Sequence, residues 1–172
     1  MRRNLLLAPL ALSLLAGCGY HVSGHADLLP KNIRTIAIPA FGNATVRYRL
    51  GDLLPGALTR EFLTRTRYRI VADPNEADAI LSGTLVNYNS YPAVFDPASG
   101  RASGVIMVAA LSITLTDRAT GKPLFVRPSM EVRERYEISV DSRAYFEESY
   151  TAVERMSRDV ARSVVSAVLE KF

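Results

Sequence analysis

The spacing of apolar and polar residues divides the chain beyond residue 32 into strands and helices. Apolar residues that alternate with polar ones, between prolines, glycines and short polar turns, predict strands. Apolar residues that recur every three or four positions predict helices. In chain order the pattern predicts a strand at 33–39, a helix at 48–64, a strand at 68–71, three long strands at 79–91, 104–117 and 124–138, and a helix at 145–171.

Each predicted helix carries one apolar stripe. In the last helix the stripe consists of Val153, Met156, Val160, Val164, Ala167 and Val168. Pro55 lies within the first helix and costs it a hydrogen bond unless that helix starts near Asp52. The order strand-helix-strand-strand-strand-strand-helix indicates an α+β fold, with a mixed four- to five-stranded sheet covered on one face by two helices. Residues 33–172 are predicted to form this single domain.

The long strands are predicted to form successive hairpins. Gly121 supplies a positive φ in the second connection, and residues 92–103 form a longer loop in the first. The middle strand contains a nearly continuous apolar run, Val105–Ala110. This run is typical of a central strand buried on both faces. The alternative is an apolar surface that would meet an amphiphile. Asp73–Asp78 is predicted to be a turn, and a single helical turn there is left open.

The N-terminal residues have a different pattern, in which two cations precede an apolar run. Arg2 and Arg3 come before Leu5–Leu15, and these 11 residues are too few to span a bilayer, because a spanning helix needs about 20. The following Leu15-Ala16-Gly17-Cys18 resembles the lipobox of bacterial lipoproteins, in which cleavage precedes a cysteine that carries diacylglycerol. Residues 1–17 are predicted to be a signal peptide and 18–32 a lipidated tether. The alternative is an ordinary cleaved signal followed by an incidental cysteine.

The composition narrows the possible functions. Cys18 is the only cysteine, so the mature chain has no disulfide, no thiol nucleophile and no cysteine-ligated zinc. Removing the signal peptide lowers the formal net charge from +4 to +2. A nucleic-acid partner is rejected, because such a partner requires a concentrated basic face and an exported chain rarely meets one.

No catalytic constellation is visible in the sequence. Both histidines, His21 and His25, lie in the predicted tether, where neighbouring glycines and Pro30 disfavour a helix that would bring them together. The carboxylate pairs Asp73 with Asp78 and Glu147 with Glu148 are interpreted as caps and solvated charge. The sequence therefore predicts no enzyme, no metal site and no cofactor beyond the covalent lipid.

Several arginines could bind a ligand, although the sequence predicts no catalysis. One group surrounds the end of the first helix and is interpreted as a helix cap and a blunted strand edge: Arg60, Arg65, Arg67 and Arg69. Arg101 lies in the first hairpin loop, and Arg143 lies just before the last helix. A guanidinium is a planar, bidentate donor for phosphate, so both are candidate phosphate-binding residues. The alternative for both is solvated loop charge.

A series of motifs runs through the mature chain in a fixed order. They are Cys18-Gly19-Tyr20-His21-Val22, Leu29-Pro30, Ile33-Arg34-Thr35-Ile36-Ala37-Ile38-Pro39, Leu58-Thr59-Arg60-Glu61-Phe62, Tyr68-Arg69-Ile70-Val71 and Ala77-Asp78-Ala79. This series resembles the lipopolysaccharide-assembly lipoprotein family (LptE-like) and covers nearly the whole mature chain.

The resemblance implies a lipoprotein that plugs a large outer-membrane β-barrel translocon and binds lipopolysaccharide for delivery to the outer leaflet. Its partners would be the barrel, lipopolysaccharide and, through acyl chains on Cys18 that include palmitate, the outer membrane. The domain would lie on the periplasmic side or inside the barrel lumen. The family's lipopolysaccharide-binding cations lie in the first hairpin loop and before the last helix, where Arg101 and Arg143 are the candidates. The alternative is a curli-secretion-type or scaffolding envelope lipoprotein that self-associates.

Overall fold

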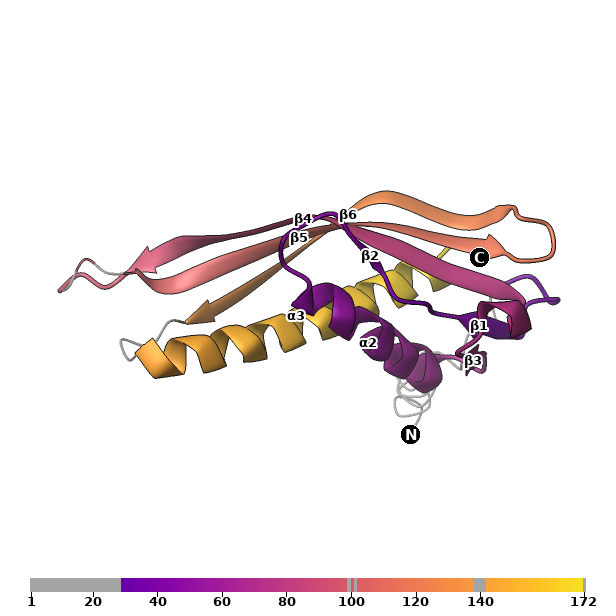
Figure 1. The fold of residues 1–172 in the computed structure, drawn as a ribbon, viewed down its shortest axis with the longest axis horizontal. Coiled ribbons are helices and arrows are strands. Elements are labelled where there is room, and N and C mark those ends of the chain that lie inside the picture. The colour runs from indigo at the N-terminus through magenta and orange to yellow at the C-terminus, as the bar shows by residue number, and fades with distance from the viewer. Residues whose placement is uncertain (1–28, 99, 101, 138–141, 172) are drawn as a thin grey trace, which may run out of the picture.

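The computed structural model describes residues 29–98, 100, 102–137 and 142–171, without the side chains of 142–149. Figure 1 shows an elongated sheet with two helices beneath it. In chain order the elements are β1 (Thr35–Ala37), β2 (Gly42–Asn43), α2 (Arg49–Arg65), β3 (Arg69–Val71), the 3₁₀ turn η2 (Pro74–Glu76), β4 (Ala79–Phe95), β5 (Ala102–Asp117), β6 (Pro123–Glu137) and α3 (Ser142–Leu169).

The sheet is mixed, as the sequence predicts. Its strand order is β3-β1-β4-β5-β6, and β2 pairs separately with β4. β1 is parallel to both β3 and β4, whereas β4, β5 and β6 form two long antiparallel hairpins. Gly42–Asn43 lies between the first predicted strand and the first predicted helix, yet it pairs in parallel with Thr84 and Leu85 and gives the sheet a sixth strand. In the turn between β5 and β6, Gly121 adopts the predicted positive φ, 67°.

The two helices cover one face of the sheet, and they pack against each other (Figure 1). The buried residues of α2 recur with helical spacing and include Leu54, Leu58 and Phe62, all at 0 % exposure. The α3 stripe meets the same core through Met156, Val160, Val164 and Val168. The α+β class and its covered face are therefore as predicted. α2 begins at Arg49 rather than near Asp52, so Pro55 lies inside the helix and the bond to the Gly51 carbonyl is lost.

The middle strand, β5, is buried on one face only. Val105, Met107 and Ala109 are buried against the helices, whereas Ile106 and Val108 on the opposite face are only partly covered. The prediction that the apolar run is buried on both faces is therefore wrong. The helices cover a single face of the sheet, and strand neighbours alone shield the other face.

The first hairpin is longer than predicted, because β4 continues to Phe95 and β5 begins at Ala102. A bulge interrupts β4, where Leu85 pairs with Leu111 and Asn87 pairs with the next residue, Ala110. Val86 is the extra residue and is 44 % exposed. Because a one-residue insertion reverses which side chains face inward, Tyr88 and Ser90 lie on the helix side of the sheet.

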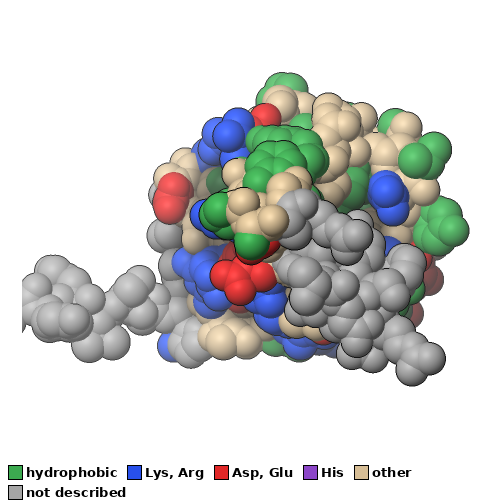
Figure 2. All heavy atoms as spheres, turned by 90° about the vertical axis from the view of Figure 1, so that its left-hand side faces the viewer, with side chains coloured by type: hydrophobic (Ala, Val, Ile, Leu, Met, Phe, Trp, Pro, Cys, Tyr) green, Lys and Arg blue, Asp and Glu red, His purple; other side chains and the backbone are tan. Residues whose placement is uncertain are grey.

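The first hairpin extends past the start of α2 (Figure 1). The N-terminal part of α3 lies beneath this end of the sheet, whereas α2 does not extend so far. Figure 2 looks onto this end and shows hydrophobic and basic side chains next to one another.

Candidate functional site

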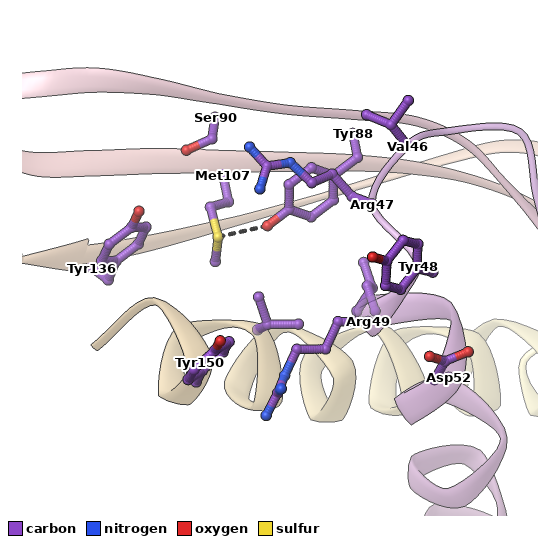
Figure 3. Close-up of a pocket in the computed structure, with 12 residues that line it drawn as sticks. Val46, Arg47, Tyr48, Arg49, Asp52, Tyr88, Ser90, Met107, Tyr136 and Tyr150 are labelled. Atoms are coloured by element: carbon purple, nitrogen blue, oxygen red, sulfur yellow. Dashed lines mark hydrogen bonds between the residues drawn. The ribbon is translucent and has the colours of Figure 1, made fainter. Parts of the chain in front are cut away.

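A groove of about 610 Å³ lies between the sheet, the start of α2 and the N-terminal part of α3 (Figure 3). Its lining comes from five parts of the chain: residues 46–50 with Asp52, then Tyr88 and Ser90 of β4, Met107 of β5, Tyr136 of β6, and Tyr150 and Val153 of α3. Its volume lies in the range of about 300–1,000 Å³ that is typical of small-molecule sites. The groove is the candidate binding site of the described residues.

Two arginines lie at the groove, Arg47 in the loop before α2 and Arg49 at the first position of that helix. The Asn43 carboxamide oxygen accepts a hydrogen bond from the Thr45 N–H at 2.8 Å, and the Asn43 amide group donates to the Arg47 carbonyl at 3.1 Å. The Arg47 N–H donates to the Thr45 hydroxyl at 3.1 Å. Asparagine and threonine commonly form such local turns with the backbone. This network positions Arg47, and α2 begins two residues later with Arg49.

Arg49 joins the start of α2 to α3. Its guanidinium carbon lies 4.1 Å from the centroid of the Tyr150 ring, which is the geometry of a cation–π contact. In Figure 3 the Arg49 side chain reaches from α2 toward α3, beside the labelled Tyr150. The contact keeps a positive charge at one side of the groove.

Tyr88 places a hydroxyl inside the groove. That hydroxyl donates a hydrogen bond to the Met107 sulfur at 2.8 Å, shown as a dashed line in Figure 3. Burial raises the pKa of Tyr88, and the positive charge of Arg47 opposes part of this rise. The hydroxyl is therefore neutral near neutral pH, and the groove contains no phenolate at this position.

The groove is apolar inside and basic at its edge. Inside it, the half-buried Tyr88 and Val153 present apolar surface, backed by Leu50, Met107 and Tyr136 at exposures of 1 %, 2 % and 5 %. Arg47 and Arg49 are exposed, and Asp52 is the one carboxylate among the described lining residues. This combination suits an amphiphile that carries negative charge.

The site residues predicted from sequence are placed as follows. Cys18 and Arg101 lie outside the described residues. Arg143 lies in the first turn of α3, because this helix begins at Ser142 and not at 145, and its side chain is not described. Their roles stay predictions. Arg47 and Arg49 were not among the residues predicted from sequence, although two arginines that alternate with the apolar Val46 and Tyr48 were a usable signal.

Among the other charged residues noted in the sequence, Arg65 and Asp73 have hydrogen-bond partners within the fold. Arg65 donates hydrogen bonds to Glu61 at 3.3 Å and to Ser166 at 2.8 Å, and so joins α2 to α3. Asp73 accepts a hydrogen bond from the Asn75 N–H at 2.8 Å and caps η2, as predicted.

In the part of the chain that the structure describes, no three His, Cys, Asp or Glu residues gather into a possible metal site. None of the helices described there is both long and apolar enough to cross a membrane.

A family model described as lipopolysaccharide-assembly (LptE) matches residues 33–168. The chain belongs to the lipopolysaccharide-assembly family. Its members are non-enzymatic lipoproteins of the cell envelope that need no cofactor. The motifs noted in the sequence therefore identified the family correctly.

Solved structures share the fold of this family member at low sequence identity. Rare lipoprotein B of Shewanella oneidensis is 16 % identical, with a TM-score of 0.51, over 78 % of this chain and 95 % of that chain. A protein of Xanthomonas campestris is 15 % identical, with a TM-score of 0.53, over 82 % of this chain and 88 % of that chain. Among curated proteins, none matches the sequence.

Proposed function

We propose that this family member is a non-catalytic outer-membrane subunit of the lipopolysaccharide translocon. Lipidated at Cys18, it plugs a large β-barrel and binds lipopolysaccharide on its way to the outer leaflet. The observation that carries the proposal is the family match across residues 33–168. The lipobox-like sequence before Cys18 supports the anchor.

The form of the molecule is compatible with a plug. Three long strands, β4, β5 and β6, form a sheet with helices on one side and partly covered side chains on the other. A sheet of this kind offers a continuous surface for contact with the inside of a barrel.

Lipopolysaccharide binding is proposed to use Arg101 and Arg143. Arg101 lies in the connection between β4 and β5, and Arg143 lies at the start of α3. Lipopolysaccharide molecules associate through divalent cations that bridge their phosphates, and fixed guanidinium groups compete for those phosphates. Each charge-assisted hydrogen bond is worth about 1.5–3 kcal/mol.

The deciding experiment is affinity purification of the full chain from detergent-solubilised outer membranes, followed by mass spectrometry. A large β-barrel at equal stoichiometry, together with lipopolysaccharide, is the expected result. The Cys18→Ala variant is expected to lose membrane association. A self-assembled ring without a barrel would overturn the proposal and favour a secretion or scaffolding lipoprotein.

The lipopolysaccharide site has its own test. Arg101→Glu and Arg143→Glu are expected to weaken lipopolysaccharide binding with no change in melting temperature. Arg158→Glu, a charge reversal at an exposed position of α3, is the matched control. Binding that is equal in all three variants would remove both arginines from the site.

A further inference from the structure

We infer that the groove between α2, α3 and the sheet binds one linear alkyl chain whose headgroup carries a phosphate. The inference rests on the proposed function for the source of this ligand, an acylated lipid of the envelope. It assigns the alkyl chain to a groove lined by described residues, and it does not depend on Arg101 or Arg143.

The interior of the groove favours an alkyl chain. Tyr88 and Val153 are half-buried and present apolar surface to the groove, and Leu50 and Met107 form an almost completely buried layer behind them. The Tyr88 hydroxyl is directed to the Met107 sulfur, so this polar group is already satisfied (Figure 3). Water gains few hydrogen bonds on an apolar surface, and an alkyl chain displaces such water favourably.

The mouth of the groove exposes apolar and aromatic side chains. Val46 is 88 % exposed, Tyr48 is 72 % exposed and Tyr150 is 47 % exposed. These are three of the eight large hydrophobic side chains that are exposed among the described residues. Apolar side chains that gather at one place on a surface mark sites of interaction. Here they continue the apolar interior of the groove outward.

The charge at the groove selects an anionic headgroup. Arg47 and Arg49 are exposed beside the mouth, and neither forms an ion pair with a described carboxylate. The guanidinium carbon of Arg49 lies over the Tyr150 ring, and a guanidinium carries five N–H donors, so this contact does not use up the donors that a phosphate would need. Hydrogen bonds from the Asn43 side chain and to the Thr45 hydroxyl hold the Arg47 backbone just before α2.

The test uses the full chain in phosphatidylcholine nanodiscs and a dodecyl phosphate with a photoreactive diazirine at the end of its alkyl chain. Mass spectrometry identifies the labelled peptides. We expect labels on the strands and helix that line the groove, at or beside Met107 and Val153. Dodecanol with the same diazirine is the uncharged control probe.

Two variants on neighbouring residues separate the groove from the other face of the sheet. Ser90 lines the groove, and Asn89 is exposed on the opposite face of β4. Ser90→Phe is expected to lower labelling about tenfold, because the added ring occupies space that the alkyl chain would fill. Asn89→Phe is expected to leave it unchanged. Equal labelling in the wild type and Ser90→Phe, or an equal loss in both variants, overturns the inference.

The headgroup is tested by the double substitution Arg47→Gln with Arg49→Gln. Labelling by the phosphate probe is expected to fall about tenfold or more, and labelling by the alcohol is expected to stay the same. Equal changes with both probes overturn the role of the two arginines.

The purified wild type is also tested for a co-purifying β-barrel protein. Groove labelling without a barrel supports the groove and overturns the proposed function, whereas a barrel without groove labelling overturns the groove alone.

Discussion

The Asp78 carboxylate and the Thr35 hydroxyl bind each other's backbone across 43 residues of sequence. One Asp78 oxygen accepts hydrogen bonds from the Thr35 N–H and the Thr35 hydroxyl, each at 2.9 Å. The Thr35 hydroxyl in turn accepts a hydrogen bond from the Asp78 N–H at 2.8 Å. The Arg34 N–H donates to the same carboxylate oxygen at 2.9 Å. These hydrogen bonds hold the start of β1 next to Asp78, the residue before β4. The parallel pairing of β1 with β4 begins at this point.

Replacing Asp78 by alanine removes three acceptor contacts at once. We expect Asp78→Ala to lower the free energy of unfolding by about 1–3 kcal/mol, because three donors lose their shared partner. Urea unfolding followed by circular dichroism measures this change. Glu76→Gln, at an exposed position two residues earlier, is the control and is expected to leave the free energy unchanged. Similar losses in both variants would show that the local turn, and not the Asp78 carboxylate, determines the effect.

The same carboxylate makes stability depend on pH in the acid range. The hydrogen bond from the Arg34 N–H, followed by that from the Thr35 hydroxyl, lowers the pKa of Asp78 from its ordinary value of 3.8. A carboxylate whose pKa is lower in the folded state stabilises the fold above the unfolded pKa. This contribution is lost as the pH falls below 3.8 and through the folded pKa.

We therefore expect the stability difference between wild type and Asp78→Asn to be constant from neutral pH down to about pH 5. Below that pH the difference is expected to shrink as the wild-type carboxylate takes up its proton. Urea titrations over a pH series measure it. Asp117, whose pKa is lowered chiefly by a hydrogen bond from the Thr120 N–H, is present in both proteins and cancels in the comparison. A difference that grows on acidification would contradict the prediction.

Gly83 of β4 has no room for a side chain. A Cβ there would overlap the Phe41 ring and lie 2.9 Å from the Ile113 Cδ1 atom. We expect Gly83→Ala to destabilise the fold by about 1–3 kcal/mol through overpacking. Gly56→Ala is the matched control, because its Cβ on α2 would be 3.6 Å from the nearest atom and alanine stabilises a helix interior by about 0.5–1 kcal/mol. Thermal unfolding should give shifts of opposite sign, and shifts of one sign would contradict this.

The contact between Arg49 and Tyr150 is expected to couple the start of α2 to α3. A double-mutant cycle with Arg49→Gln and Tyr150→Leu should give a coupling free energy of about 0.5–1 kcal/mol, typical of an exposed cation–π pair. Chemical unfolding of the four proteins measures it. A cycle with Arg158→Gln in place of Arg49→Gln should give no coupling. Additive effects in the first cycle would show that the contact does not form in solution.

The long helices and strands could be predicted because their signals are local. The α3 stripe of Val160, Val164 and Val168 repeats with helical spacing and is fully buried as expected. Gly121 adopts the positive φ that a short hairpin turn requires. The motif series was sufficient to identify the family, and the match of the family model to residues 33–168 confirms this identification.

The sequence by itself determined the succession of elements, the class of fold, the family and the predicted lipid anchor, since each depends on residues close together in the chain. Tertiary structure decided the rest. The bulge at Val86 turns Tyr88 and Ser90 toward the helices, and it can be recognised only once β4 is paired with β5. The groove also joins Arg49 to Tyr150, residues that become neighbours only when α2 and α3 pack beneath the same sheet. Local periodicity states which side chains share a face, but pairing and packing between distant segments determine which faces meet.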